Sequence, residues 1–190
     1  MTVLAFDMDE VIFPFAKSYA LWRKREGMES FQERDLTSYD FAKVLRDDNA
    51  DGEHTSAFIA DPLTLGVGPV RGSRGGLVEL VRKHDIVVVT NRYETQSVGT
   101  LAWMDRWFPG VAARVIFARP RRGVEGKSKG LICSEIGAEL LIDDSPEHIA
   151  GLSETPGLLF GDYPWQHSFD EALPRVRNWA ELLVVLGGSS

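Results

Sequence analysis

Short apolar runs rich in β-branched residues recur along the chain. They are TVLAF (2–6), DIVVVT (85–90), RVIFA (114–118), ELLID (139–143) and GLLF (157–160). Apolar residues stand at consecutive rather than alternate positions in these runs, which is typical of strands that are buried on both faces of a parallel sheet.

Helix-like segments lie between the apolar runs. They cover residues 72–84, 95–108 and 128–137, and Gly137 is positioned to end the last of them as a C-cap residue. The alternation of strand and helix predicts an α/β fold: a Rossmann-like parallel sheet with helices on both faces and right-handed crossovers.

The stretch 17–70 interrupts this alternation. It is longer than a crossover needs, mixes aromatic and charged residues, and contains no strand-like run. We interpret it as a small helical cap, inserted after the first strand and lying over the edge where that strand ends. Residues 1–16 and 71–190 would then form the core. A pair of ordinary crossover helices is the alternative for 17–70.

Composition and charge narrow the class of protein. The 190 residues, 44% hydrophobic and 26% charged, suffice for one good core. A formal net charge of -7 argues against an extended nucleic-acid-binding surface, but a small anionic substrate stays open, since a metal and local cations can invert the field in a cleft. Cys133 is the only cysteine, and neither a targeting segment nor an apolar stretch of roughly 20 residues is visible. We therefore expect a cytoplasmic protein without a membrane segment.

Polar side chains follow three of the predicted strands at the point where each strand ends. They are Asp7 and Asp9 after the first, Thr90, Asn91 and Arg92 after the second, and Asp143 and Asp144 after the fourth. Because the carboxyl ends of parallel strands lie on one edge of a sheet, where ligands bind, we expect these residues to meet in one crevice.

Several carboxylates in one crevice need a compensating cation. Two carboxylates about 4 Å apart repel by about 4 kcal/mol at an effective dielectric constant of 20. A site built from oxygen ligands, with a substrate phosphate as a further ligand, suits Mg²⁺, and no His or Cys pair nearby has zinc spacing. One carboxylate could attack the phosphorus of a phosphate monoester while a second, two residues on, protonates the leaving oxygen.

These residues resemble the four motifs of the haloacid dehalogenase (HAD) superfamily of phosphohydrolases, in the expected order. The resemblance of DMDEV implies that Asp7 is the nucleophile and Asp9 the acid/base, which also gives its backbone carbonyl to the metal. VVVTNR implies that Thr90 binds phosphate, and we assign Asn91 and Arg92 to the same task.

The third and fourth motifs are carried by SKGLICSEIGAELLIDDSPEH, which implies a phosphate-binding lysine and an acidic metal-binding pair. Lys129 is preferred for the lysine because it directly precedes the helix, with Lys127 as the competitor. Within the acidic pair, Asp144 is expected to bind the metal directly and Asp143 through water or by supporting it.

A narrower resemblance, to the 5'(3')-deoxyribonucleotidase group, rests on DMDEVIFPF, LLIDDSPEH and GDYPWQHS…RVRNWAELL. It implies that Phe15 stacks on a nucleobase, whereas ordinary packing of Phe13 and Phe15 at the cap hinge is the alternative. Tyr39 and Phe41 are base or sugar contacts by composition only. Glu10 departs from the superfamily, most of which has glycine there.

The sequence thus predicts a Mg²⁺-dependent phosphomonoesterase that acts on a small phosphate ester, most simply a nucleotide, with a homodimer left open. The alternatives are another small ester or a nucleic-acid end as substrate, a receiver-like phospho-acceptor domain, and carboxylates that merely cap helices and turns. The arginines of ARPRRG, which are Arg119, Arg121 and Arg122, form either a solvated loop or a ligand clamp. The four histidines are interpreted as surface or structural residues; they are His54, His84, His148 and His167.

Overall fold

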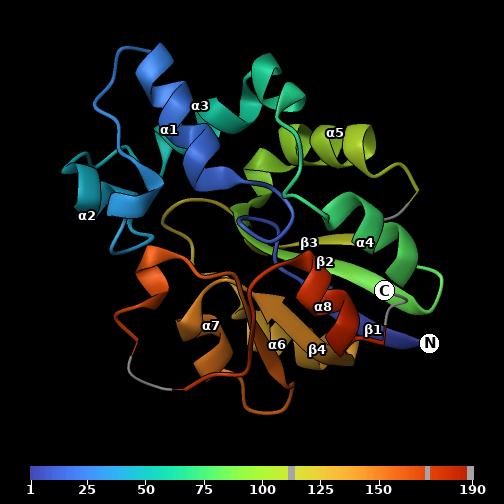
Figure 1. The fold of residues 1–190 in the computed structure, drawn as a ribbon. Helices are drawn as coiled ribbons and strands as arrows, with labels where there is room; N and C mark the ends of the chain where they lie inside the picture. The colour runs from blue at the N-terminus through green and yellow to red at the C-terminus, as the bar shows by residue number, and fades with distance from the viewer. Residues whose placement is uncertain (111–113, 170–171, 188–190) are drawn as a thin grey trace.

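A six-stranded, fully parallel sheet forms the centre of the protein in the computed structural model, which describes residues 1–110, 114–169 and 172–187 (Figure 1). The strand order is β3-β2-β1-β4-β5-β6. The strands are β1 (Thr2–Phe6), β2 (His84–Tyr93), β3 (Arg114–Arg119), β4 (Ala138–Asp143), β5 (Gly157–Phe160) and β6 (Arg175–Val176). The chain order reverses direction at β1, so β1 and its neighbours frame the crevice of a doubly wound sheet.

Alternate residues of the central strands enter two separate hydrophobic cores, one on each face of the sheet. In β2, Ile86 and Val88 join one core while Val87 and Val89 join the other. All four side chains are buried. The strand therefore has to be apolar at every position, which explains the unbroken run in the sequence.

Helices cover both faces of the sheet. The helices are α1 (Phe15–Arg25), α2 (Phe41–Leu45), α3 (Glu53–Ala60), α4 (Ser73–Leu80), α5 (Ser97–Trp107), α6 (Lys129–Ile136), α7 (Pro146–Ala150) and α8 (Trp179–Val185), with short 3₁₀ turns at Glu33–Asp35, Pro62–Gly66, Glu94–Gln96 and Pro164–Gln166. Side chains of α4, α5 and α8 enter the larger core, and those of α6 and α7 enter the smaller one. The predicted α/β fold with helices on both faces is confirmed.

The stretch 17–70 is helical and contains no residue of a named strand, although all of it is described. In Figure 1, α1, α2 and α3 stand together beyond one edge of the sheet. Rings from this stretch, among them those of Tyr19, Phe41 and Phe58, belong to the same hydrophobic core as Phe6 of β1. The division into a core and a cap, with boundaries at residues 17 and 70, stays a prediction.

A tight turn follows β1 and carries the chain toward α1. The backbone N–H groups of Ile12 and Phe13 both donate to the carbonyl of Met8, and Glu10 has a φ of 62°, in the left-handed region that side chains other than glycine rarely adopt. This conformation accounts for the glycine common at this position in the superfamily. None of the helices in the described parts of the chain is long and apolar enough to cross a membrane.

Cys133 lies on α6 and is fully buried in the smaller core. Burial raises the pKa of its thiol to about 11, a shift that Lys129 opposes and Asp143 assists. Because the thiolate is the reactive form, we expect no labelling of the native protein by a maleimide at pH 7.5, and stoichiometric labelling in guanidinium chloride. Rapid labelling of the native protein, followed by mass spectrometry, would contradict the packing of α6.

Candidate active site

Three carboxylates from two strand ends meet at one edge of the sheet. The side chains of Asp7, directly after β1, and of Asp143 and Asp144, at the end of β4, offer ligand oxygens that all lie within 4.8 Å of one another. All three residues are buried. Their convergence follows from the pairing of β1 with β4, in which the Asp7 N–H donates to the carbonyl of Ile142 at 2.8 Å.

Lys129, the first residue of α6, places its ammonium group between two of these carboxylates. Its Nζ lies 2.7 Å from Asp7 Oδ1 and 2.6 Å from Asp143 Oδ2, and its side chain is 2% exposed. Lys127 instead pairs with Glu135 on the surface, where its side chain is 56% exposed. The structure therefore puts Lys129, and not Lys127, among the acids.

One ammonium group cannot balance three buried carboxylates. Burial raises the pKa of Asp7 to about 6, with Asp143 and Asp9 adding repulsion and Lys129 opposing the shift. Burial and the charges of Asp143 and Asp7 raise the pKa of Asp144 well above its ordinary value. Burial acts on Asp143 too, but Lys129 and His148 outweigh it and hold the pKa of Asp143 low. The site thus has excess negative charge that a bound cation would neutralise.

Asp143 is fully engaged by groups of the protein. Its Oδ2 accepts from Lys129, and its Oδ1 accepts the N–H of Ser145 at 2.9 Å and faces His148 Nδ1 at 3.1 Å. The other ring nitrogen of His148 lies 2.9 Å from Asn91 Nδ2. If the His148 ring carries its proton on Nδ1, Nδ1–H donates to Asp143 and Nε2 accepts from the Asn91 amide. Asp143 and His148 then together orient that amide.

Asp144 is held from the opposite side. Trp165 Nε1 donates to Asp144 Oδ2 at 2.9 Å, and Gln166 Nε2 donates to the Asp144 carbonyl at 2.7 Å. Oδ1 of Asp144 has no hydrogen-bond donor among the described residues. Asp144 also lines the cavity of about 480 Å³ that is described below, whereas Asp143 does not. This geometry favours Asp144 over Asp143 for direct contact with a cation.

The side chain of Asp9 does not belong to the three-carboxylate group and pairs with Arg92. Arg92 Nη2 lies 2.6 Å from Asp9 Oδ1. Thr90 is fully buried, and its hydroxyl accepts the N–H of Arg92 at 3.1 Å. Asp9, Asn91 and Arg92 line the cavity, and Thr90 does not.

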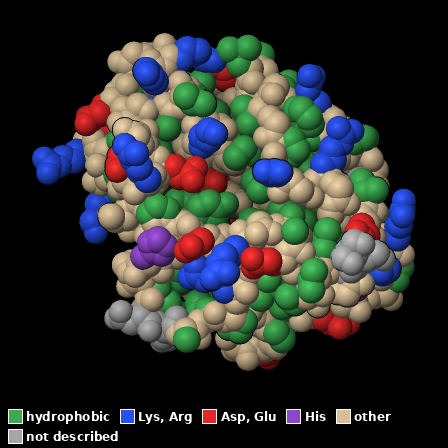
Figure 2. Space-filling view, in the orientation of Figure 1, with side chains coloured by type: hydrophobic (Ala, Val, Ile, Leu, Met, Phe, Trp, Pro, Cys, Tyr) green, Lys and Arg blue, Asp and Glu red, His purple; other side chains and the backbone are tan. Residues whose placement is uncertain are grey.

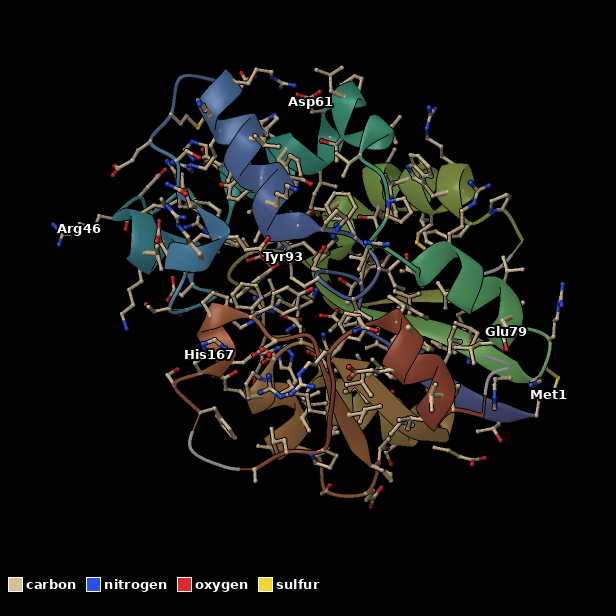
Figure 3. The ribbon with its side chains drawn as sticks, in the orientation of Figure 1. Met1, Arg46, Asp61, Glu79, Tyr93 and His167 are labelled. Atoms are coloured by element: carbon tan, nitrogen blue, oxygen red, sulfur yellow. The ribbon has the colours of Figure 1, made fainter. Side chains whose placement is uncertain are left out.

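A cavity of about 480 Å³ opens above the carboxylates, with the helical stretch 17–70 as its other wall. Phe15, Tyr39 and Phe41 line it on that side, and the three rings contact one another at centroid distances of 5.0 to 6.4 Å. Figure 3 shows side chains filling the space between these helices and the sheet, where Tyr93, another lining residue, is labelled. The volume and the apolar wall suit a small molecule with a flat ring.

Glu10 connects the turn after β1 with α1 and with the stretch 17–70. Its carboxylate accepts the N–H of Ala16 and the hydroxyl of Tyr39, and Tyr163 donates to its backbone carbonyl at 2.8 Å. Burial raises the pKa of Glu10 to about 8, against the hydrogen bond from Ala16. The carboxyl group that departs from the superfamily pattern therefore forms structural contacts and does not line the cavity.

The arginine-rich end of β3 and the loop after it lie near the stretch 17–70 and the cavity. Arg122 Nη2 donates to the carbonyl of Asp48 at 2.9 Å, and Arg119 lines the cavity. Arg121 is exposed. On the face drawn in Figure 2, Lys and Arg side chains are interspersed with Asp and Glu and form no continuous basic stripe.

Sequence reasoning missed His148, Trp165 and Gln166 as parts of the site. His148 follows Asp144 by four residues and lies on α7, and its Nδ1 lies 3.1 Å from Asp143 Oδ1. Trp165 and Gln166 belong to the stretch GDYPWQHS, which no local sequence pattern connects with Asp144. The other three histidines do not line the cavity, as expected for surface or structural residues.

Comparison with known proteins identifies the family of the chain. Residues 1–187 match the family described as "5' nucleotidase, deoxy (Pyrimidine), cytosolic type C protein". The chain belongs to this family. It is therefore a hydrolase of the HAD superfamily, with the nucleotidase-like phosphatase class predicted from its motifs.

Individual relatives agree with this assignment. A 5'(3')-deoxyribonucleotidase of Bacillus subtilis (strain 168) is 22% identical over 182 residues, which are 95% of each chain. A predicted phosphatase from Clostridium acetobutylicum has a similar structure, with a TM-score of 0.68 at 12% identity over 97% of both chains. YfnB of Bacillus subtilis, described as a HAD-hydrolase bound to magnesium, has a TM-score of 0.61 at 15% identity over 97% of this chain and 98% of its own. At these identities the solved structures support the fold.

Proposed function

We propose that the protein is a Mg²⁺-dependent phosphomonoesterase that hydrolyses (deoxy)nucleoside monophosphates through an aspartyl-phosphate on Asp7. The observation that carries this proposal is the group of Asp7, Asp143 and Asp144 around Lys129, at the base of a cavity with an aromatic wall. The family and the Bacillus subtilis relative support a nucleotide as substrate.

The donor set fits a hard divalent cation. Three carboxylate oxygens within 4.8 Å of one another, two of them on groups whose pKa is raised, form an all-oxygen site with unbalanced negative charge. Asp7, Asp144 and the backbone carbonyl of Asp9 would hold Mg²⁺, with Asp143 in support. When bound, Mg²⁺ would neutralise charge on the substrate phosphate and on the carboxylates.

The chain's own residues supply the remaining chemistry. An oxygen of Asp7 attacks phosphorus while Asp9 protonates the departing ester oxygen. Asp9 then takes a proton from the water that hydrolyses the aspartyl-phosphate, which restores both residues. Lys129 and the Thr90–Asn91 segment stabilise the phosphoryl oxygens, because this transfer depends mainly on positioning and charge neutralisation.

The aromatic wall supports a nucleotide over a smaller ester. Phe15, Tyr39 and Phe41 line the cavity, although Phe15 and Phe41 are buried in the larger core. Stacking on a base contributes about 1–3 kcal/mol per base. Residues of the stretch 17–70 line the cavity on this side, which favours a mononucleotide over a nucleic-acid end. Residence in the cytoplasm and formation of a homodimer remain predictions, the first supported by the single, buried cysteine.

A phosphate-release panel tests the proposed function. Purified protein should release phosphate from 5'- and 3'-deoxyribonucleotides faster than from ribonucleotides, sugar phosphates or a 5'-phosphorylated oligonucleotide. Removal of Mg²⁺ with EDTA should abolish release, and added Mg²⁺ should restore it. Preferred turnover of a sugar phosphate or of the oligonucleotide would refute the substrate, and full activity in EDTA would refute the metal. Stable phosphorylation without turnover would instead support a receiver-like domain.

A further inference from the structure

Arg92, at the carboxyl end of β2, forms a clamp on the side chain of Asp9. Its Nε lies 3.1 Å from Asp9 Oδ2 and 3.2 Å from Oδ1, and its Nη2 lies 2.6 Å from Oδ1. Two guanidinium nitrogens thus engage both carboxylate oxygens, which fixes the plane of the carboxylate as well as its distance.

The guanidinium group is itself held from behind. Its Nη1 donates to the hydroxyl of Thr100, a fully buried residue of α5, at 3.1 Å. Its central carbon lies 4.7 Å from the ring centroid of Phe13 and 5.7 Å from that of Phe15. With a side chain that is 3% exposed, Arg92 has little freedom to turn toward a substrate.

We propose that Arg92 is a positioning residue, which holds the carboxyl group of Asp9 at the place where it exchanges protons with the substrate. This inference rests on the proposed function, in which Asp9 is the acid/base. It replaces the role in phosphate binding that the sequence suggested for Arg92, because all three guanidinium nitrogens already have protein partners.

The clamp would matter in both steps of the proposed reaction, because Asp9 gives up a proton in the first and takes one back in the second. In the first step the Asp7–phosphorus bond forms, the ester bond breaks, and the proton of Asp9 moves to the departing oxygen. In the second step water adds to phosphorus, Asp7 leaves, and a proton of the water returns to Asp9. An alkoxide is a poor leaving group and needs the proton, whereas 4-nitrophenolate leaves as a stable anion.

Leaving groups therefore separate positioning of Asp9 from binding of phosphate. We expect Arg92→Met to lower kcat/KM on thymidine 5'-monophosphate about a hundredfold, the lower range for general acid catalysis, and to lower kcat/KM on 4-nitrophenyl phosphate less than about tenfold. The quantity to compare is kcat/KM, because it reports the first step, in which the two leaving groups differ, whereas the second step is the same for both substrates. Arg92→Lys should recover part of the loss, since an ammonium group can donate to one oxygen but cannot grip both.

Arg23→Met provides a matched control. Arg23 is a second buried arginine, 2% exposed, which pairs with Asp47 at 2.8 Å and lies 5.6 Å from the Tyr19 ring centroid, and it does not line the cavity. Its replacement should lower the melting temperature without changing the ratio of the two kcat/KM values. The double variant Asp9→Asn/Arg92→Met should be no slower on thymidine 5'-monophosphate than Asp9→Asn alone.

Equal losses of kcat/KM on both substrates would overturn the clamp and return Arg92 to phosphate binding. An unchanged kcat/KM would overturn it too. If Arg92→Met does not fold, Thr100→Val, which removes only the support behind the guanidinium group, must reproduce the leaving-group effect in smaller measure, and failure to do so overturns the proposal. Asp7→Asn tests the proposed function independently of the clamp. It should lose turnover on both substrates, whatever the Arg92 variants show.

Discussion

Asp7→Asn is expected to release phosphate at least about a thousandfold more slowly than the wild-type protein, on every substrate that the wild type accepts. The amide keeps the shape of the side chain, but it is not a nucleophile toward phosphorus and lacks the negative charge with which the carboxylate attracts a cation. The measurement is initial-rate phosphate release at saturating Mg²⁺, with circular dichroism as a check on the fold.

The same variant should keep its stability, which distinguishes loss of chemistry from loss of structure. The pKa of Asp7 is raised to about 6 in the folded protein, chiefly by burial, above its ordinary value of 3.8. The folded state therefore binds the proton more tightly, and ionising Asp7 removes stability as the pH rises from about 4 to about 6. Without metal at pH 7, Asp7→Asn should melt no lower than the wild type.

Mg²⁺ should reverse that order. A cation that binds only the folded state raises the melting temperature, and the wild type has one more carboxylate to hold it than the variant. Thermal melts of both proteins in EDTA and in Mg²⁺, at pH 5 and pH 7, give the comparison. Wild-type turnover by Asp7→Asn would exclude Asp7 as nucleophile, and an equal response of both proteins to Mg²⁺ would exclude it as a ligand.

The sheet could be predicted from sequence because burial on both faces leaves a local pattern. The residues of β1 and β2 that enter either core, such as Ile86 to Val89, must be apolar whichever core they enter, so the runs TVLAF and DIVVVT are visible without any knowledge of neighbours. β6 could not be found in this way. It has two residues, Arg175–Val176, and a strand of that length has no periodicity.

The end of β2 illustrates a different limit. The apolar run ends at Thr90, but the strand continues to Tyr93 because an irregularity in its pairing with β3 carries it on, until Tyr93 lies opposite Arg119. Polar residues in that extension, Asn91 and Arg92, therefore belong to the strand and not to a loop. A rigid strand end is a better support for the Arg92 clamp than a loop would be.

The candidate site was partly predictable for a topological reason. In a parallel sheet the carboxyl ends of all strands share one edge, so Asp7 and the Asp143–Asp144 pair had to approach one another. Which atoms then touch depends on side-chain packing between segments far apart in the chain. The Arg92–Asp9 pair spans 83 residues and the Trp165–Asp144 hydrogen bond spans 21, and neither leaves a trace in local sequence.

Lys129→Met should cost both activity and stability, whereas Lys127→Met should cost neither. Lys129 is the buried cation between Asp7 and Asp143, and removing one partner of such a network typically costs about 3–5 kcal/mol of folding free energy. Lys127 makes an exposed ion pair with Glu135, for which the loss is at most about 1 kcal/mol. We expect phosphate release by Lys129→Met to fall at least about a hundredfold, since a charge aimed at the phosphoryl oxygens is lost.

The stability of Lys129→Met should depend on pH in a way that the stability of Lys127→Met does not. Without Lys129, the carboxylates of Asp7 and Asp143 lose the charge that opposes their mutual repulsion, so both groups will hold protons to higher pH. The deficit in stability of Lys129→Met should therefore be largest above about pH 6 and shrink on acidification, as the carboxyl groups become neutral. Urea unfolding at pH 5 and pH 7.5 measures both deficits, with Lys127→Met as the reference. A stability deficit of Lys129→Met that does not change with pH would place the catalytic cation elsewhere, because a lysine buried among titrating acids contributes to the free energy of unfolding in proportion to their charge. A loss of turnover confined to Lys127→Met would do the same.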